Sequence, residues 1–536
     1  MALYYREEPK GGAFLSRFKW LTMCIVLLLL LVCTVYWYQY CERKLVLVTS
    51  ALFAIAFVSL FVAHALGMFN TLRRQLGVYA SFLASSCLLF AVVFPPFSAA
   101  DEYHHYLSSY WLSECATGEA EWSRPETISM RADDWELYSS HGARDDASDY
   151  QQFTIDAAAF QQVFDEFSLG KKYDGEVSVP SYAMYGFTLG GENAIAKVGS
   201  VIGIIFAKLL NLGAYPLFYL GRIFSAAFFV ACAVAAVRIT PVGRNVFMAV
   251  SLLPMTLQLA GSYSYDGGTI GLSFVFIALA LKAMLGEGRL NRRDLIALAI
   301  FAALLSPCKA VYVLEVGLVL FIPSRRFSSK RNALIIKMGI LVLAAASVAV
   351  TKLSMVASVS SGTTTFAFPG ERTYSLADLL SNPLATLSLF FRTLDTAGDS
   401  YWMTAIGSNL GWLQQNIGMP AFLMGAYAIV MLYAAQRSED DPAELMPWQR
   451  ALFLAIAGAV WLAVMLSMAV SWTPVSAEVI QGVQGRYILP VAPLLLLSLR
   501  SARISISGCS FGVALLAPLT LNAFFMVRLI SLALVV

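Results

Sequence analysis

Two adjacent carboxylates and two nearby imidazoles directly follow an apolar run that is about as long as a membrane is thick. They are Asp101, Glu102, His104 and His105, and the run before them ends near a proline pair. Hydrocarbon cannot hydrogen-bond an ionised carboxylate, so such groups sit at an interface, in a water-filled cavity, or against partners. A carboxylate at this boundary can be tuned by burial and still reach a hydroxyl group, as a general base must. We therefore expect Asp101 or Glu102 to act as an acid/base residue.

The same residues also have structural interpretations. Asp101 precedes a helical pattern, as an N-cap residue does. His104 and His105, together with Asp101, have the ligand types of a divalent metal site, but histidines also suit a membrane interface as amphipathic side chains. The sequence alone leaves a metal cofactor open.

Further ionisable residues lie in or near the outer ends of other apolar runs. Such a residue is a candidate site residue by default, and a departing lipid phosphate needs positive charge; snorkelling toward headgroups is the alternative. The cations are Arg222, Lys309, Arg486 and Arg528. Glu315, in mid-span, is expected to pair with Lys309.

Asp266 follows Tyr265 at the outer turn of a predicted hairpin and precedes Gly267-Gly268. Its carboxylate could orient a sugar hydroxyl or support a metal. Equally, Asp-Gly is ordinary turn chemistry.

Composition places these residues in a polytopic membrane protein of the all-α class. The 536 residues are 58% hydrophobic and 13% charged, and the mean hydropathy is +0.68. A spanning helix needs roughly 20 apolar residues. No P-loop, dinucleotide fingerprint or zinc-hydrolase motif occurs, and no dense basic block points to nucleic acid. The predicted cytoplasmic loops are too short for a nucleotide-sugar domain, so we expect any donor to be carried by a lipid and met from outside.

Basic residues flanking the apolar runs orient the chain by the positive-inside rule. They predict about 13 spans, with a cytoplasmic N-terminus, an external C-terminus and long external loops. The spans are expected near 20–39, 45–68, 78–94, 216–238, 246–262, 268–285, 295–307, 310–323, 333–353, 419–436, 451–471, 487–500 and 509–533.

The long polar segment 101–195 follows the third predicted span and carries 18 acids against 5 bases, as an exported loop would. Lys197 and Lys208 fall on one face of the next apolar stretch, which therefore predicts a helix lying in the outer interface. The segment 354–418 predicts an amphipathic surface helix. A Cys41–Cys115 disulfide is conceivable. The expected regions are 1–100, 101–195, 196–353, 354–418 and 419–536.

Several short motifs, in order from about residue 95 to 500, resemble a family of bacterial membrane proteins called domain of unknown function 2142. Asp101-Glu102-x-x-His105-Tyr106 is similar to its Asp-Glu-x-x-His-Phe signature. The other matches are Gly221-Arg222, Ser264-Tyr265-Asp266, Lys309-x-x-Tyr312, Leu410-Gly411-Trp412-Leu413 and Gln484-Gly485-Arg486-Tyr487-Ile488-Leu489-Pro490.

That family in turn resembles the GT-C glycosyltransferases, integral enzymes that use polyprenyl-phosphate sugars. The resemblance implies a GT-C-like helical bundle in the bacterial plasma membrane, with Asp101 and Glu102 catalytic. The partners would be a polyprenyl-phosphate-linked sugar donor, a glycan or lipid acceptor, and membrane lipids. The expected substrate-binding residues are His105, Arg222, Tyr265, Asp266, Lys309, Trp412, Arg486 and Tyr487. The alternatives are a transporter or flippase of lipid-linked sugars and a non-catalytic assembly protein of the cell envelope.

Overall fold

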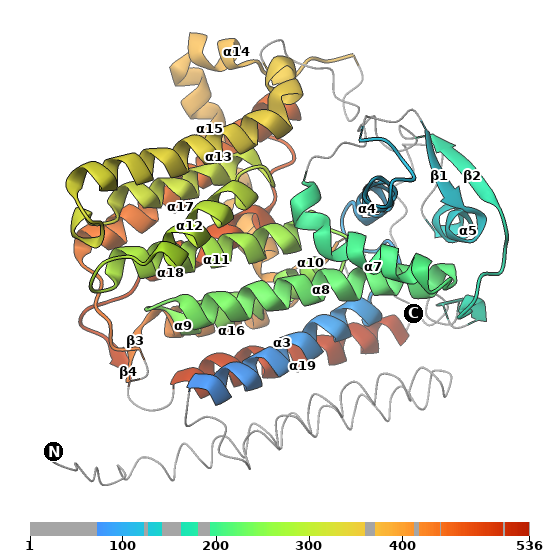
Figure 1. Cartoon of the computed structure of the whole chain (residues 1–536), viewed down its shortest axis with the longest axis horizontal. Coiled ribbons are helices and arrows are strands. Elements are labelled where there is room, and N and C mark those ends of the chain that lie inside the picture. The colour runs from blue at the N-terminus through green and yellow to red at the C-terminus, as the bar shows by residue number, and fades with distance from the viewer. Residues whose placement is uncertain are drawn as a thin grey trace, which may run out of the picture.

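The chain forms a helical bundle that carries a small lobe at one end (Figure 1). The computed structural model describes residues 72–122, 127–141, 162–163, 165–180, 193–359, 370–411, 418–439, 441–506 and 510–534. The bundle consists of α3 (Leu72–Val93), α8 (Ala214–Ile239), α9 (Arg244–Ser251), α10 (Pro254–Ala260), α11 (Tyr265–Leu285), α12 (Arg292–Leu305), the 3-10 helices η2 (Ala310–Phe321) and η3 (Ser324–Arg326), α13 (Lys330–Val359), α16 (Ala421–Ala435), α17 (Pro447–Ser471), the 3-10 helix η5 (Gly485–Val491), α18 (Ala492–Ser498) and α19 (Ser510–Leu534).

The remaining elements lie in the lobe, at its junction with the bundle, or beside the bundle. The lobe has α4 (Glu102–Thr117), β1 (Thr127–Arg131), α5 (Ala132–His141) and β2 (Glu176–Pro180). The 3-10 helix η1 (Ala194–Lys197) and α7 (Val198–Leu209) join the lobe to α8. The predicted amphipathic segment contains α14 (Leu376–Ser381) and α15 (Pro383–Ile406), and the two-residue strands β3 (Arg437–Ser438) and β4 (Ser505–Ile506) pair at the far end.

The predicted spans from the third onward each coincide with one or two of these helices, and the first two lie outside the described residues. Five described helices are long and apolar enough to cross a membrane: Leu72–Val93, Ala214–Ile239, Tyr265–Leu285, Lys330–Thr351 and Pro447–Ser471. The stretch 246–262 is two helices, because Pro254 has no N–H to continue α9 and instead starts α10. The protein is therefore a helical membrane protein, while the total of 13 crossings stays a prediction.

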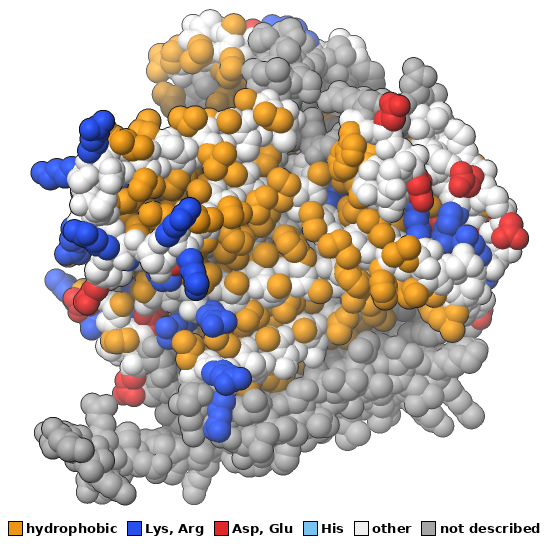
Figure 2. All heavy atoms as spheres, viewed as in Figure 1, with side chains coloured by type: hydrophobic (Ala, Val, Ile, Leu, Met, Phe, Trp, Pro, Cys, Tyr) orange, Lys and Arg blue, Asp and Glu red, His pale blue; other side chains and the backbone are white. Residues whose placement is uncertain are grey.

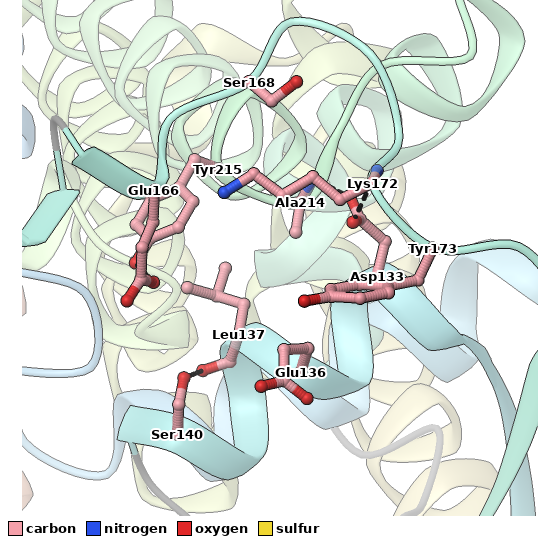
Figure 3. Close-up of a pocket in the computed structure, with 10 residues that line it drawn as sticks. All are labelled: Asp133, Glu136, Leu137, Ser140, Glu166, Ser168, Lys172, Tyr173, Ala214 and Tyr215. Atoms are coloured by element: carbon pink, nitrogen blue, oxygen red, sulfur yellow. Dashed lines mark hydrogen bonds between the residues drawn. The ribbon is translucent and has the colours of Figure 1, made fainter.

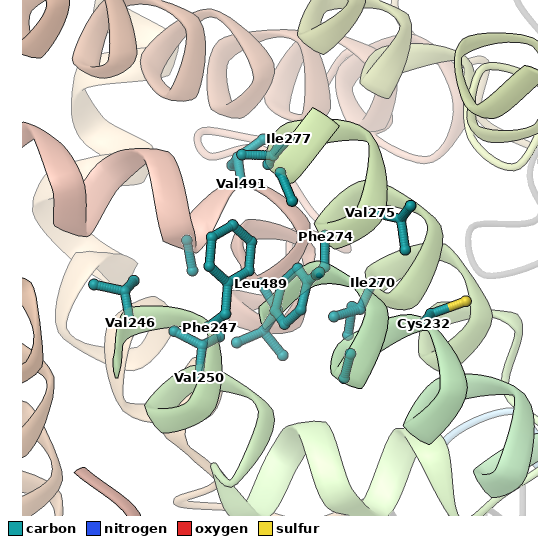
Figure 4. Packing of buried hydrophobic residues seen from close by; sticks show 14 of the residues in the cluster. Cys232, Val246, Phe247, Val250, Ile270, Phe274, Val275, Ile277, Leu489 and Val491 are labelled. Atoms are coloured by element: carbon teal, nitrogen blue, oxygen red, sulfur yellow. The ribbon is translucent and has the colours of Figure 1, made fainter. Parts of the chain in front are cut away.

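Helix α11 runs through the centre of the bundle. Of the 18 consecutive residues that are most apolar in α11, 89% are buried, whereas the corresponding share in α13 is 17%. Phe274 of α11 meets Phe247 of α9 edge to face with ring centroids 5.4 Å apart, and Leu489 and Val491 of η5 pack beside them (Figure 4). These interlocked side chains hold α11 and η5 against α9, and the first turns of α11 and η5 carry candidate site residues.

Charged side chains are concentrated at the two ends of the molecule. Lys and Arg predominate at the end opposite the lobe, the lobe shows both acidic and basic side chains, and a broad apolar band lies between the two ends (Figure 2). The large exposed apolar side chains include Leu334, Val342 and Ile429. A band of this kind suits contact with lipid tails.

The lobe has a core of its own that continues into the bundle. Strands β1 and β2 pair antiparallel from Thr127 opposite Pro180 to Arg131 opposite Glu176, a small sheet that the all-α expectation did not include. Phe97, Tyr106 and Tyr138 pack there on residues of α7 and α8. The boundary predicted at residue 195 therefore does not separate two hydrophobic cores.

Helix α7 packs lengthwise on α8, and neither Lys197, at the end of η1, nor Lys208 of α7 is exposed. Cβ atoms at Gly199 and Gly203 would lie 2.6 and 2.5 Å from carbonyl oxygens of α8, so only glycine permits this approach. Lys197 is buried and donates to Ser108 Oγ at 2.7 Å. Lys208 lies 3.5 Å from the Glu114 carboxylate. Both cations turn toward α4 because it offers them oxygen partners.

The contact between Gly221 and Tyr263 provides a test of the packing at this junction. A Cβ at Gly221 would overlap the phenol of Tyr263, which is 1% exposed and cannot easily move away. We expect Gly221→Ala to lower the free energy of unfolding by about 1–3 kcal/mol through overpacking. Gly425 has open space around its Cβ position, so Gly425→Ala should be neutral or stabilising. Thermal unfolding of both variants in detergent checks this, and equal melting temperatures would contradict it.

Candidate functional site

Asp101 occupies the N-cap position of α4, but its side chain does not cap the helix. The backbone is left-handed, with φ 57° and ψ 17°, and the carboxylate makes no capping hydrogen bond. Its Oδ2 instead accepts from Arg486 Nη2 at 3.2 Å, and the side chain is 43% exposed. The capping alternative is therefore not what the structure contains, and the carboxylate remains reachable from solvent.

Arg486 lies between two carboxylates from distant parts of the chain. Its guanidinium approaches Asp101 on one side, and its Nε lies 3.1 Å from Oδ2 of Asp266 on the other. Asp266 sits in the first turn of α11, behind the N-cap Ser264, and its side chain is 6% exposed. The guanidinium thus connects the reachable carboxylate to a buried one.

Lys309 and Tyr487 extend the site beside Arg486. The Lys309 ammonium lies 3.1 Å from the centre of the Tyr487 ring, a cation–π geometry. Tyr312 Oη donates to the Tyr487 carbonyl at 3.0 Å and so holds the start of η5 against η2. Arg486 also lies near this ring, 5.5 Å from its centre. Two cations therefore share one aromatic residue.

The imidazoles form another side of the site. His105 is 7% exposed, and its ring meets Tyr265 edge to face at 5.1 Å. His105 Nδ1 has no hydrogen-bond partner among the described residues. Burial, then the nearby Lys197 ammonium, lowers the pKa of His105 well below its usual range. The same two causes lower the pKa of His104 to about 4. Both rings are therefore neutral near pH 7.

Glu102, one residue from Asp101, is in a very different environment. It is fully buried and pairs with Arg222 through two hydrogen bonds, Nε to Oε1 at 2.8 Å and Nη2 to Oε2 at 2.5 Å. Oε1 also accepts from Tyr263 N at 3.1 Å. Arg222 donates further to the carbonyls of Ala91, Phe94 and Pro95 at 2.6–2.9 Å. Each ion of the pair thus has several partners within the protein.

These contacts change the roles predicted for Glu102 and Arg222. A base must reach a substrate proton, and a phosphate ligand needs donors to spare. Glu102 is inaccessible, and the guanidinium of Arg222 is committed to Glu102 and to three carbonyls. The pair instead ties the end of α3, the start of α4, α8 and the turn before α11 into one structure.

The other predicted site residues and pairs have mixed outcomes. No three-ligand group of His, Cys, Asp and Glu occurs in the described part of the chain, and Arg486 lies where a metal shared by Asp101 and Asp266 would be expected. Glu315 does not pair with Lys309 as expected: it accepts from Ser273 Oγ at 2.6 Å, because Ser273 of α11 faces it. Cys115 is a buried free thiol. Trp412 and Cys41 lie outside the described residues.

Sequence reasoning missed two residues that shape the site. Lys197 was expected at the interface, yet it lies beside both imidazoles and influences their pKa values. Tyr263 was noted only as part of a loop, yet its backbone N–H binds Glu102 and its hydroxyl donates to Phe218 O at 3.0 Å. Lys197 could have been found because it is a lysine inside an apolar run. Nothing in the local sequence indicates the role of Tyr263.

The buried pair predicts a stability difference between two ion pairs. We expect Glu102→Gln and Arg222→Met each to lower the free energy of unfolding by about 3–5 kcal/mol, because each leaves the other ion buried without its counter-charge. Arg372 pairs with Asp378 at 2.5 Å but is 54% exposed. Arg372→Met should therefore change the stability little, because solvent screens an exposed ion pair. Thermal melts and yields of folded protein check this; similar losses for all three variants would contradict it.

The histidines predict an acid-labile component of stability. The pKa of His104 is about 4 in the folded protein and about 6.5 when unfolded, so between these values only the unfolded chain binds the proton. The free energy of unfolding therefore falls as pH falls through this window, and His105 acts in the same direction. Burial raises the pKa of Glu114 to about 7, which contributes with the opposite sign. Comparing His104→Asn with the native protein isolates the first contribution.

We expect the melting temperature of the native protein to fall more than that of His104→Asn as pH falls from 7 to 5. Melts at several pH values in one buffer series measure this. Parallel curves for the two proteins would show that His104 does not titrate differently on unfolding.

Comparison with known proteins gives a family. No curated protein and no solved structure matches the chain. Residues 85–495 match the family described as predicted membrane protein (DUF2142). This range covers most of the chain and contains Asp101, Asp266, Lys309 and Arg486, as well as the Glu102–Arg222 pair. The chain therefore belongs to the DUF2142 family of predicted membrane proteins.

Proposed function

We propose that this membrane protein is a GT-C-like glycosyltransferase. It transfers a sugar from a polyprenyl-phosphate-linked donor to a glycan or lipid acceptor of the cell envelope, on the outer face of the membrane. The observation that carries the proposal is the side chain of Asp101, which leaves the helix cap unused and remains exposed beside Arg486. A carboxylate with a purely structural role would accept a hydrogen bond at the helix N-terminus or be buried in an ion pair, as Glu102 is.

The reaction is an inverting displacement with Asp101 as the general base. The acceptor O–H gives its proton to Asp101, and the oxygen forms a bond to the anomeric carbon of the donor sugar. The bond from that carbon to the phosphate oxygen breaks on the opposite face, and the lipid phosphate leaves with the electron pair. Proton acceptance of this kind contributes typically 10²–10⁴-fold to rate.

The neighbouring residues have distinct parts in this scheme. Arg486 orients Asp101 and is itself anchored by buried Asp266. The Lys309 ammonium, above the Tyr487 ring, supplies positive charge for the departing phosphate. The neutral ring of His105 and the ring of Tyr265 form a wall for the sugar.

The charge distribution supports an external site. Basic residues gather at the bundle end away from the lobe (Figure 2), and the positive-inside rule assigns such an end to the cytoplasm. Asp101 follows α3 directly, so the proposed base lies where this apolar helix leaves the membrane. A lipid-linked donor presents its phosphate at that depth. The two carboxylates of the site are joined by Arg486, so the scheme requires no metal ion.

The decisive variant is Asp101→Asn, which keeps the size of the side chain and removes the base. We expect it to lower sugar transfer by about 10²–10⁴-fold with little change in melting temperature, because Asp101 is exposed and its one ion pair is replaceable by a hydrogen bond. The measurement is transfer from a lipid-linked donor by purified protein, together with cell-surface glycan. Glu478→Gln is the control, since Glu478 is an exposed acid outside the site.

Two results would reject the proposal. One is undiminished glycan in cells that carry normal amounts of the Asp101→Asn protein. The other is native protein that moves lipid-linked sugar across a bilayer but never cleaves it, which is the behaviour of a flippase.

A further inference from the structure

The lobe contains a polar cavity that the proposed reaction does not use. Its volume is about 170 Å³, and it lies among α5, the segment from Glu166 to Tyr173, and the first residues of α8 (Figure 3). This volume is below the roughly 300–1,000 Å³ of sites for drug-sized ligands. The cavity therefore has room for a single small group such as one sugar ring.

The walls of the cavity are held together by two backbone N–H groups that donate to one buried carboxylate. Asp133 is 4% exposed; its Oδ1 accepts from Lys172 N at 2.9 Å and its Oδ2 from Ala214 N at 2.7 Å. A Cβ at Gly213 would lie 2.6 Å from Gly170 O, so the two segments touch backbone to backbone. Three separate parts of the chain are thereby fixed around the cavity before any ligand arrives, which lowers the entropy cost of binding.

The lining combines carboxylates, a cation and aromatic rings. Glu136 is exposed at the cavity, and Glu166 accepts from the Tyr215 hydroxyl at 2.5 Å. Figure 3 shows the Glu136 and Glu166 side chains on different sides of the cavity, with Lys172 extending between the walls. Tyr173 is 51% exposed and contributes an aromatic ring to the lining.

These groups select the chemistry of the ligand. Three carboxylates against one ammonium repel a phosphate, so this is not a second donor site. Carboxylates accept hydrogen bonds from hydroxyl groups, the ammonium donates to them, and an aromatic ring covers the apolar C–H face of a sugar ring. We propose that the cavity binds one uncharged or amino-bearing sugar residue of the acceptor glycan.

The position of the cavity connects it to the site. The N–H that Asp133 binds belongs to the first residue of α8, and Arg222 lies eight residues along the same helix, or about 12 Å at 1.5 Å per residue. An acceptor anchored in the lobe is thus held near the residues that the Glu102–Arg222 pair positions. That the bound sugar belongs to the acceptor rests on the proposed function, whereas sugar binding by the cavity does not depend on it.

Sugar binding is tested on the full chain in nanodiscs, with free glucose, galactose, N-acetylglucosamine and glucosamine at millimolar concentrations as probes. Saturation-transfer NMR and titration calorimetry give the affinity. We expect at least one sugar to bind, and Glu136→Gln and Tyr173→Ala each to raise its Kd about tenfold or more. Asp174→Asn should leave the Kd unchanged, because Asp174 is exposed, next in sequence, and outside the cavity.

Measuring binding in the Asp101→Asn background separates this inference from the proposed function. Sugar binding retained there, and weakened by Glu136→Gln, supports the cavity even if no transfer is ever detected. Absence of binding by all four sugars overturns the inference, as does binding that Glu136→Gln and Tyr173→Ala leave unaltered. Binding of inorganic phosphate that competes with the sugar also overturns it. Melting curves of each variant establish that the protein is folded.

Discussion

The ion pair between Glu102 and Arg222 is the contact on which the rest of the site depends. Two charges in the apolar interior of a membrane protein persist only when paired and hydrogen-bonded. The guanidinium of Arg222 binds carbonyls in the last turn of α3 and directly after it, and the carboxylate of Glu102, in the first turn of α4, binds the backbone before α11. Residues more than a hundred positions apart are thereby fixed within a few ångströms of one another.

This fixed frame explains why two neighbouring acids differ so much. Glu102 faces inward, and its carboxylate accepts hydrogen bonds from Arg222 and from the backbone N–H of Tyr263. Asp101 precedes it in a left-handed conformation that turns its side chain toward Arg486. One acid anchors the chain while the other remains available. The same division occurs on η5, where Arg486 lies in the site and Leu489 packs in the core.

Much of the site was predictable as a set of residues but not as an arrangement. Asp101, Asp266, Lys309 and Arg486 each attract notice because a charge beside apolar sequence needs a reason. They come together through tertiary contacts: Asp101 and Arg486 are 385 positions apart in the sequence, and no local pattern predicts their contact. The sequence likewise could not predict which of the neighbouring residues Asp101 and Glu102 is buried and which is exposed.

The fold was predictable to the extent that apolar length decides it. Helices α3, α8, α11, α13 and α17 follow directly from runs long enough to span. The break at Pro254 was visible in the sequence and should have been expected. The 3-10 geometry of η2 and η5 was not, because tertiary packing selects it. Strand β1 alternates exposed and buried residues, a signal too short to outweigh the helical context.

The left-handed backbone of Asp101 has a further consequence for how this protein tolerates change. A side chain in that conformation costs roughly 1–2 kcal/mol, although aspartate adopts it more readily than most residues, and glycine would adopt it without that cost. Glycine would also abolish the carboxylate. Thermal stability alone would therefore be served better by glycine at this position, whereas the proposed acid–base role requires the carboxylate of aspartate, so the two requirements conflict at one residue.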